Sequence, residues 1–105
     1  MVYETEHWGR IYGELEGLYQ IRNANTILHA VNRLTRTDIL GKYRDDAEGL
    51  ARILRKAFAS VTETTGLMGR WQKIQDRPTV VCDAGHNTGG WKYISRQLEE
   101  MPCRQ

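Results

Sequence analysis

The residues best suited to chemistry lie between Thr79 and Leu98. The short β-branched run Thr79–Cys82 predicts a buried strand, and a glycine-containing turn leads from it into a helix. Ligands of open α/β sheets bind at the carboxyl ends of the strands, and the first turn of the next helix offers unpaired N–H groups to a phosphate. Asp83, at the strand end, would accept hydrogen bonds from a ribose hydroxyl, and His86, in the turn, would lie within reach of a phosphate.

The same turn has a simpler interpretation. Aspartate and asparagine commonly fill turns and cap helices, and Asn87 lies where the turn enters the helix. On this segment alone, capping is the favoured interpretation. Neither standard phosphate motif, G-x-x-x-x-G-K-[ST] or G-x-G-x-x-G, occurs in the sequence.

Two further residues have both a ligand-binding and a structural interpretation. Arg70 follows Gly69 and precedes an expected strand. Its guanidinium could pair with phosphate oxygens, although an exposed arginine at a strand edge is the commoner arrangement. Asn23 begins a helical pattern. Its amide can both donate to and accept from an adenine edge, whereas its spacing alone favours a helix N-cap.

The other candidates favour structural roles. His7 and His29 share no metal-ligand spacing with each other or with His86, so a zinc site is not expected. The three tryptophans fit a core or an interface better than a site. No Ser–His–Asp or Cys–His arrangement follows from the spacing. We therefore expect no metal site and no complete catalytic set in this chain.

Three helices and several short strands are expected to position these residues. Apolar periodicity predicts a helix that starts at Asn23 and breaks at 35–41, and a second over Ala47–Val61. A third carries Trp91, Ile94, Leu98 and Met101, and Pro102 stops it. Strand character appears within 7–15, 70–74 and 79–82. The glycines of the 66–69 stretch mark the expected domain boundary.

The composition is that of an ordinary globular chain. Of 105 residues, 40% are apolar and 27% are charged, and the net charge of +2 is too small to indicate binding to nucleic acid or to an anionic membrane. Cys82 and Cys103 are too few for a disulfide framework, so we expect reduced thiols. The sequence shows neither a signal peptide nor a run of ~20 apolar residues. A cytoplasmic protein is expected.

Three motifs, read together, carry a family resemblance. They are L-E-G-L-Y-Q-I-R-N-A from Leu15 to Ala24, T-G-L-M-G-R-W from Thr65 to Trp71, and D-A-G-H-N from Asp83. In this order they resemble the folylpolyglutamate synthase/dihydrofolate synthase family, a branch of the Mur-ligase-like enzymes. That family shows L-x-G-x-[HYF]-Q-x-x-N-A, T-G-L-x-G-R-W and D-G-A-H-N-P. The resemblance extends over nearly the whole chain.

The resemblance implies a fold class and a reaction. The fold would be α/β, with residues 1–68 forming the C-terminal part of the central ATPase domain and residues 69–105 starting a Rossmann-like C-terminal domain. The family is a group of ATP-dependent ligases that add L-glutamate to a folate or dihydropteroate carboxylate through an acyl phosphate. ATP and Mg²⁺ would be required. The resemblance makes Asn23 the adenine contact, Arg70 a phosphate contact and Asp83 the ribose contact, with His86 and Asn87 near the phosphates.

The sequence departs from the family pattern in the turn and in what it lacks. Gly85 replaces the usual alanine before the histidine, and Thr88 replaces the usual proline. The family's phosphate-binding loop and magnesium ligands lie upstream of these motifs and have no counterpart here. We therefore expect an inactive fragment that binds ATP weakly and self-associates through faces that would otherwise pack on absent parts. The alternatives are a fragment of a muramyl-peptide-type ligase and a non-catalytic nucleotide- or protein-binding module.

Overall fold

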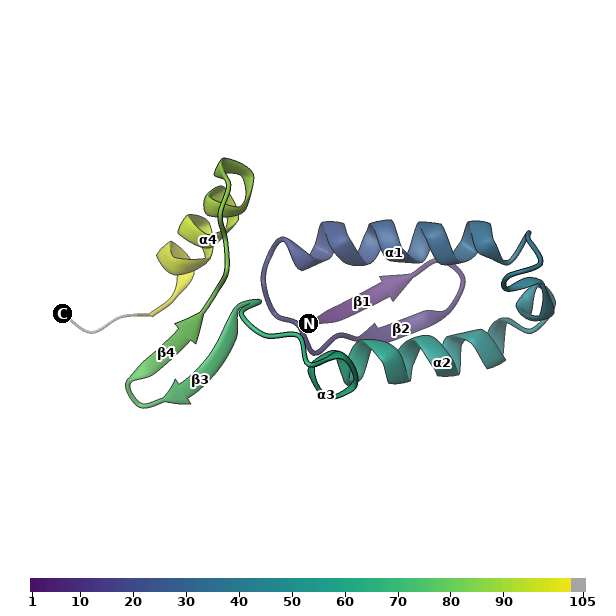
Figure 1. Cartoon of the computed structure of the whole chain (residues 1–105), viewed down its shortest axis with the longest axis horizontal. Helices are drawn as coiled ribbons and strands as arrows, with labels where there is room; N and C mark the ends of the chain where they lie inside the picture. The colour runs from purple at the N-terminus through teal and green to yellow at the C-terminus, as the bar shows by residue number, and fades with distance from the viewer. Residues whose placement is uncertain (103–105) are drawn as a thin grey trace.

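The computed structural model describes residues 1–102, so the expectation for Cys103 falls outside the described residues. The chain forms two lobes along a molecule of 55 × 27 × 23 Å (Figure 1). The N-lobe contains β1 (Val2–Thr5), β2 (Gly9–Tyr12), α1 (Gln20–Leu34), η1 (Gly41–Tyr43), α2 (Ala47–Ala59) and α3 (Val61–Thr65). The C-lobe contains β3 (Gln72–Asp76), β4 (Thr79–Cys82) and α4 (Thr88–Glu100). The fold is thus mixed helix and strand.

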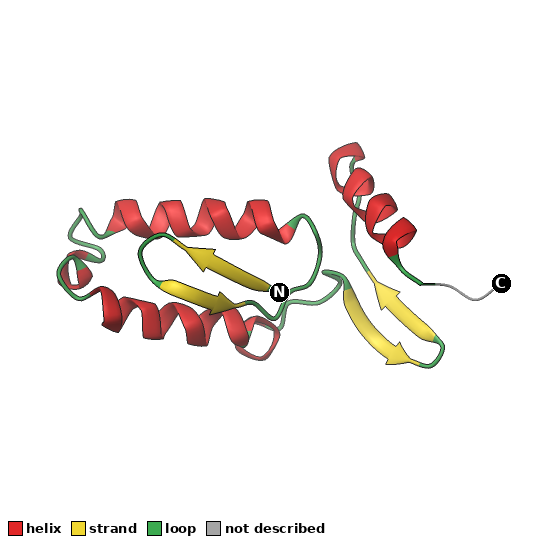
Figure 2. Cartoon of the chain, turned by 180° about the vertical axis from the view of Figure 1, so that it is seen from behind, coloured by secondary structure: helices red, strands yellow, loops and turns green. Residues whose placement is uncertain are grey.

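The N-lobe is built on an antiparallel hairpin flanked by α1 and α2 (Figures 1 and 2). Strands β1 and β2 pair in the register Val2↔Tyr12 to Thr5↔Gly9, and Gly9 begins β2 in the left-handed region at φ +72°. Strand character within 7–15 was predicted, whereas β1 was not. Its alternating burial places Tyr3 and Thr5 inward and Val2 and Glu4 outward, which is the pattern of a half-buried strand.

The core of the N-lobe lies between the hairpin and α2. It consists of Trp8, Ile11, Leu50, Ala51 and Leu54, and Leu28 and Val31 of α1 pack against it. The apolar stripe predicted on the second helix is therefore confirmed. Asp46 caps α2, because its Oδ1 accepts a hydrogen bond from the Gly49 N–H at 2.9 Å. Helix α1 starts three residues before the predicted Asn23, so Tyr19 is the N-cap and the N-cap interpretation of Asn23 is wrong.

A linker of unusual backbone conformation joins the lobes. Gly66 and Gly69 adopt φ +71° and +74°, and Trp71 adopts φ +49°, which a residue with a side chain rarely does. The linker follows α3. Because α3 comes directly after a break at Ser60, helical structure extends past Val61, where the second helix was predicted to end. The chain passes from one lobe to the other along this linker (Figure 1).

The C-lobe differs from the buried strand, turn and helix that we expected over 79–98. Strands β3 and β4 form a two-stranded antiparallel hairpin, with an irregular register between Lys73 and Gln75. Three of the four β4 residues are exposed, so the prediction of a buried strand at Thr79–Cys82 is wrong. The β-branched residues favour a strand, but burial needs covering elements, and α4 buries only Ile94 among its residues. Trp91 and Leu98 of its predicted apolar stripe remain 54% and 55% exposed.

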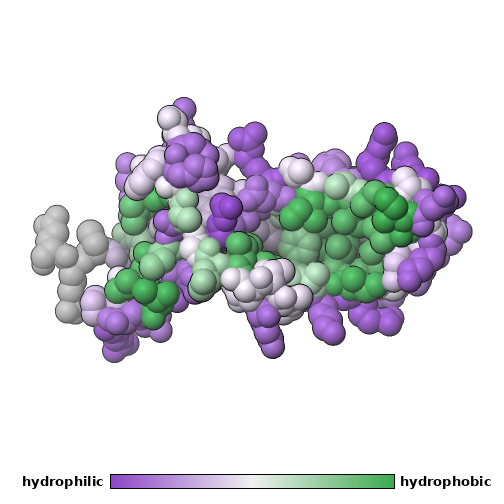
Figure 3. Space-filling model, in the orientation of Figure 1, coloured by the Kyte–Doolittle hydropathy of each residue, from purple (hydrophilic) through white to green (hydrophobic). Residues whose placement is uncertain are grey.

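An apolar groove opens on one face of the N-lobe, where green residues gather in Figure 3. It has a volume of about 330 Å³, and its lining includes Tyr3, Leu15, Ala24, Ile27, Phe58 and Leu67. Ile27 is 48% exposed there. Among residues 1–102, no helix combines the length and the apolar character needed to cross a bilayer.

Candidate functional site

Asp83 lies at the junction of the two lobes and the linker. Its Oδ2 accepts hydrogen bonds from the Tyr19 hydroxyl and from the Trp71 N–H, both at 2.8 Å. Its Oδ1 accepts one from the Gly85 N–H, also at 2.8 Å. A further hydrogen bond connects the turn after β4 to the linker, because the Ala84 N–H donates to the Gly69 carbonyl at 2.7 Å. The carboxylate expected to bind a ribose therefore holds the start of α1, the linker and its own turn together.

Tyr19 is placed by the loop that precedes α1. Gly17 allows the close approach, because a β-carbon there would lie 2.6 Å from the Tyr19 ring. Burial raises the pKa of Tyr19, and its hydrogen bond and proximity to the Asp83 carboxylate add to the rise, so the pKa reaches about 12 even though Arg70 acts in the opposite direction. Tyr19 was part of a quoted motif but received no role from the sequence, since nothing local indicates its distant partner.

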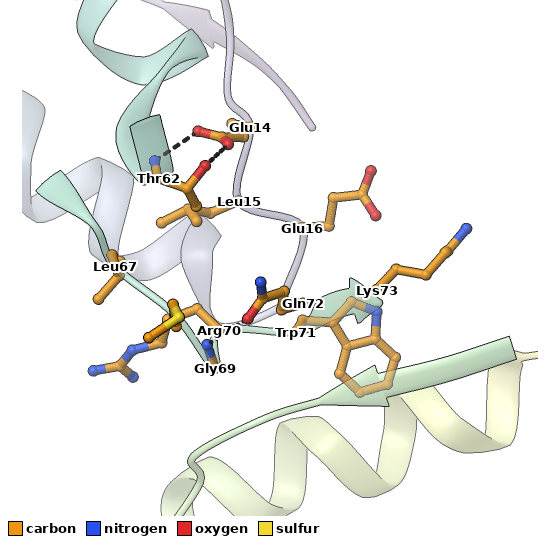
Figure 4. Close-up of a pocket in the computed structure, with 11 residues that line it drawn as sticks. Glu14, Leu15, Glu16, Thr62, Leu67, Gly69, Arg70, Trp71, Gln72 and Lys73 are labelled. Carbon is orange, nitrogen blue, oxygen red and sulfur yellow. Dashed lines mark hydrogen bonds between the residues drawn. The ribbon is translucent and has the colours of Figure 1, made fainter. Parts of the chain in front are cut away.

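Arg70 reaches this region from the linker. Arg70 and Tyr19 line the same pocket, and the positive charge of Arg70 acts to lower the Tyr19 pKa. Arg70 is exposed. Figure 4 shows the Arg70 and Trp71 side chains leaving the linker in opposite directions. Arg70 thus presents an accessible positive charge at the edge of the junction, rather than at the edge of a strand as in the structural interpretation, because β3 begins only at Gln72.

His86 and Asn87 belong to the turn that enters α4. The Asn87 Oδ1 accepts from the Gly90 N–H at 2.7 Å, which confirms the capping interpretation. His86 is exposed, and its Nδ1 lies 3.2 Å from the Ala84 carbonyl oxygen. Packing explains why glycine, rather than the alanine of the resembled family pattern, occupies position 85. A β-carbon at this position would overlap the Ile94 side chain, which is only 6% exposed.

These residues line one small pocket between the lobes, which we call the interlobe pocket. It has a volume of about 60 Å³ and is lined by Tyr19, Arg70, Asp83, Gly85, His86, Asn87, Gly90 and Ile94. Such a volume holds only a few waters. A nucleotide would have to lie across its mouth rather than inside it. The structure therefore brings together four of the five predicted site residues: Arg70, Asp83, His86 and Asn87.

Asn23 does not line the interlobe pocket. It lies one helical turn beyond Tyr19 on α1, is exposed, and its Nδ2 donates to the Gln20 Oε1 at 3.2 Å. The sequence also gave no role to Gln97 of α4, which ties the lobes beside the pocket. Its Oε1 accepts from the Leu18 N–H at 3.0 Å, and its Nε2 donates to the Glu16 carbonyl at 3.3 Å. No local signal marks a glutamine for such a contact.

A larger cleft of about 370 Å³ lies beside the linker (Figure 4). Its lining includes Glu14 and Glu16 from the loop before α1, and Arg70, Trp71 and Lys73 from the linker and β3. Glu14 is engaged in a structural role, because its carboxylate accepts from the Thr62 hydroxyl and, at 3.0 Å, from the Thr62 N–H at the start of α3. These bonds lower the pKa of Glu14.

Within residues 1–102, no three His, Cys, Asp or Glu side chains come together in a group that could hold a metal ion. Comparisons with family models, curated proteins and solved structures found no match for this chain.

Proposed function

We propose that this chain forms one wall of the nucleotide site of an ATP-dependent ligase that adds L-glutamate to a folate or dihydropteroate carboxylate. In this proposal residues 1–68 complete an ATPase domain and residues 69–105 begin a Rossmann-like domain of a cytoplasmic enzyme. The observation that carries the proposal is the convergence of Arg70, Asp83, His86 and Asn87 on the interlobe pocket. The motifs that suggested the family are far apart in sequence, and these four residues come from two of them.

The chemistry of the pocket suits a nucleotide. Arg70 offers a planar, permanently charged donor to phosphate oxygens. The first turn of α4 adds backbone N–H groups and the positive end of the helix dipole. His86 stands exposed beside that turn and could donate to a phosphate. Asp83 supplies carboxylate oxygens for ribose hydroxyls, and Asn23, further along α1, would reach the adenine edge.

The reaction itself would need groups from outside this sequence. ATP would transfer its γ-phosphoryl group to the substrate carboxylate, giving an acyl phosphate and ADP. The glutamate amine would then attack the acyl carbon, and inorganic phosphate would leave. Arg70 and the start of α4 would stabilise the charge on the transferred group. The phosphate-binding loop and the Mg²⁺ ligands would be supplied by other parts of the ligase, so this chain alone is proposed to be inactive.

A titration of the ¹⁵N-labelled chain with ADP tests the site directly. We expect weak, millimolar binding, with amide shifts confined to 19–23, 69–71 and 83–91. Arg70→Ala should weaken the binding at least several-fold, whereas Arg77→Ala, an exposed arginine on the β3–β4 turn, should leave it unchanged. Shifts spread evenly over both lobes, or tight magnesium-dependent binding, would contradict the proposal.

The acid substrate is tested in the longest reading frame that contains this sequence. Its product should consume ATP and L-glutamate in the presence of folate or dihydropteroate, with the amide product identified by mass spectrometry. Activity with a muramyl-peptide acceptor instead would move the protein to the other branch of ligases. ADP binding without any ligation would favour a non-catalytic nucleotide-binding module.

A further inference from the structure

We propose that Tyr19 is an autoinhibitory latch, whose hydroxyl occupies the Asp83 oxygen that a ribose hydroxyl would need. This inference rests on the proposed nucleotide site and concerns its regulation. The contact joins the two lobes, since Tyr19 is the N-cap of α1 and Asp83 follows β4. Ribose binding and lobe docking would then compete for one carboxylate.

The acceptor capacity of Asp83 supports the competition. A carboxylate has about four lone-pair sites. Three hydrogen bonds already use Asp83, and they come from Tyr19, Trp71 and Gly85. A ribose diol brings two O–H donors, so binding it through both hydroxyls requires one present donor to leave. Only one acceptor position of the Asp83 carboxylate therefore remains for the two ribose hydroxyls.

Tyr19 is the donor that can leave. The Trp71 and Gly85 N–H groups belong to the backbone, and the Ala84–Gly69 hydrogen bond fixes the linker against the turn. The Tyr19 hydroxyl is at the end of a side chain that is only partly buried, so rotation can bring it to water. Its departure would loosen the N-lobe from the C-lobe on the pocket side, while Gln97 keeps a second connection through Leu18 and Glu16.

The latch has a quantitative consequence for binding. A ligand that binds only the unlatched form has its apparent affinity reduced by the fraction of molecules that are unlatched. Tyr19→Phe removes the hydroxyl but keeps the ring against Gly17. Removing one such hydrogen bond should raise the affinity for a ribonucleotide about three- to tenfold.

The test compares AMP with 2′,3′-dideoxy-AMP, using ¹⁵N-detected titrations of the wild-type chain, Tyr19→Phe and Tyr93→Phe. The Tyr93 hydroxyl also makes a contact between the lobes, 3.4 Å from Arg22, but not to Asp83, so Tyr93→Phe is the matched control. We expect only Tyr19→Phe to gain affinity for AMP, and no variant to gain affinity for the dideoxy nucleotide. In the wild-type chain, AMP should bind only slightly better than the dideoxy nucleotide, because Tyr19, Trp71 and Gly85 leave a single acceptor site of Asp83 for the two ribose hydroxyls.

The outcomes separate the latch from the site. Equal AMP affinity in the wild-type chain and Tyr19→Phe would overturn the latch and leave the nucleotide site standing. A strong preference of the wild-type chain for AMP over the dideoxy nucleotide would overturn the latch even if Tyr19→Phe did not fold. Absence of binding for both nucleotides in all three proteins would overturn the proposed function and the latch with it.

Discussion

The Tyr19 hydroxyl lies 2.8 Å from the Asp83 carboxylate, although 64 positions separate the two residues in the chain. Because Tyr19 is the N-cap of α1 and Asp83 directly follows β4, this hydrogen bond is a direct connection between the lobes. It also places a neutral phenol and a carboxylate beside the exposed Arg70. Several measurable properties of the chain depend on it.

Replacing Asp83 with asparagine should destabilise the packing of the lobes. The carboxylate accepts three hydrogen bonds, whereas an asparagine amide would turn a donor toward at least one of these N–H or O–H groups. We expect a loss of about 2–3 kcal/mol in the free energy of unfolding, measured by urea denaturation. Asp76→Asn is the control, because the Asp76 carboxylate is exposed and pairs with Lys73 at 3.5 Å. Equal losses in the two variants would contradict the role of Asp83.

Tyr19 should titrate later than an ordinary tyrosine. Burial and the neighbouring Asp83 raise its pKa from 10.0 to about 12 in the folded chain. The raised pKa means that the folded state holds the proton more tightly, so the stabilisation is complete below pH 10 and is lost as the pH rises toward 12. Absorbance at 295 nm, taken as the difference between the wild-type chain and Tyr19→Phe, should show this late step. In Asp83→Asn the step should move to lower pH, and an unchanged midpoint would count against the assignment.

Glu14 should stabilise the start of α3 at neutral pH. Its hydrogen bonds with Thr62 lower its pKa below the ordinary 4.5. A lowered carboxyl pKa contributes stability above the ordinary value, and this contribution disappears as the pH falls through the lowered pKa. Glu14→Gln should therefore cost about 1 kcal/mol at pH 7, as for other helix caps. The cost should shrink in acid. Glu16→Gln, in the same loop with an exposed side chain, should have little effect at either pH.

Two glycines in and beside α4 should respond oppositely to alanine. At Gly85, a β-carbon would overlap the buried Ile94 side chain, and we expect a loss of about 1–3 kcal/mol from overpacking. At Gly89, a β-carbon would lie 3.5 Å from the Asn87 Oδ1, an ordinary contact, and the residue is helical. Gly89→Ala should therefore stabilise the chain by about 0.5–1 kcal/mol. Thermal denaturation of both variants checks the pair, and a shared sign would refute the packing explanation.

The apolar groove should make the chain self-associate through a second copy. Sedimentation or light scattering should show a mass that rises with protein concentration. Ile27→Glu places a charge in the groove and should lower this association, whereas Ile53→Glu should not, because Ile53 is equally exposed, at 47% against 48%, but is not a lining residue. A monomer at high concentration for the wild-type chain, or equal effects of the two substitutions, would remove the groove as the interface.

Local pattern was sufficient to predict several elements. Helix α2 has a regular apolar stripe and an aspartate at its N-cap, and both features depend only on residues that are close together in the sequence. The capping role of Asn87 likewise depends on residues only three positions apart. The burial of β4 was mispredicted, since the burial of a strand depends on what covers it and not on its own side chains.

The grouping of Arg70, Asp83, His86 and Asn87 could be predicted because two motifs contain all four. The partner of Asp83 could not. Tyr19 reaches it only once α1, the linker and β4 have taken their places, and Gln97 reaches Leu18 for the same reason. Contacts between lobes depend on the path of the linker, and no periodicity in the sequence records that path.

The path of the linker makes the orientation of the C-lobe sensitive to small changes in its backbone. Gly69 lies at the only crossing of the backbone between the two lobes in residues 1–102, and the molecule extends 55 Å along its longest axis. A small rotation about one torsion angle there would displace the tip of the β3–β4 hairpin by several ångströms, because displacement grows with distance from the rotation axis. The orientation of the C-lobe is thus set by a few side chains close to the rotation axis. Contacts so close to the axis resist a rotation of the lobe only weakly.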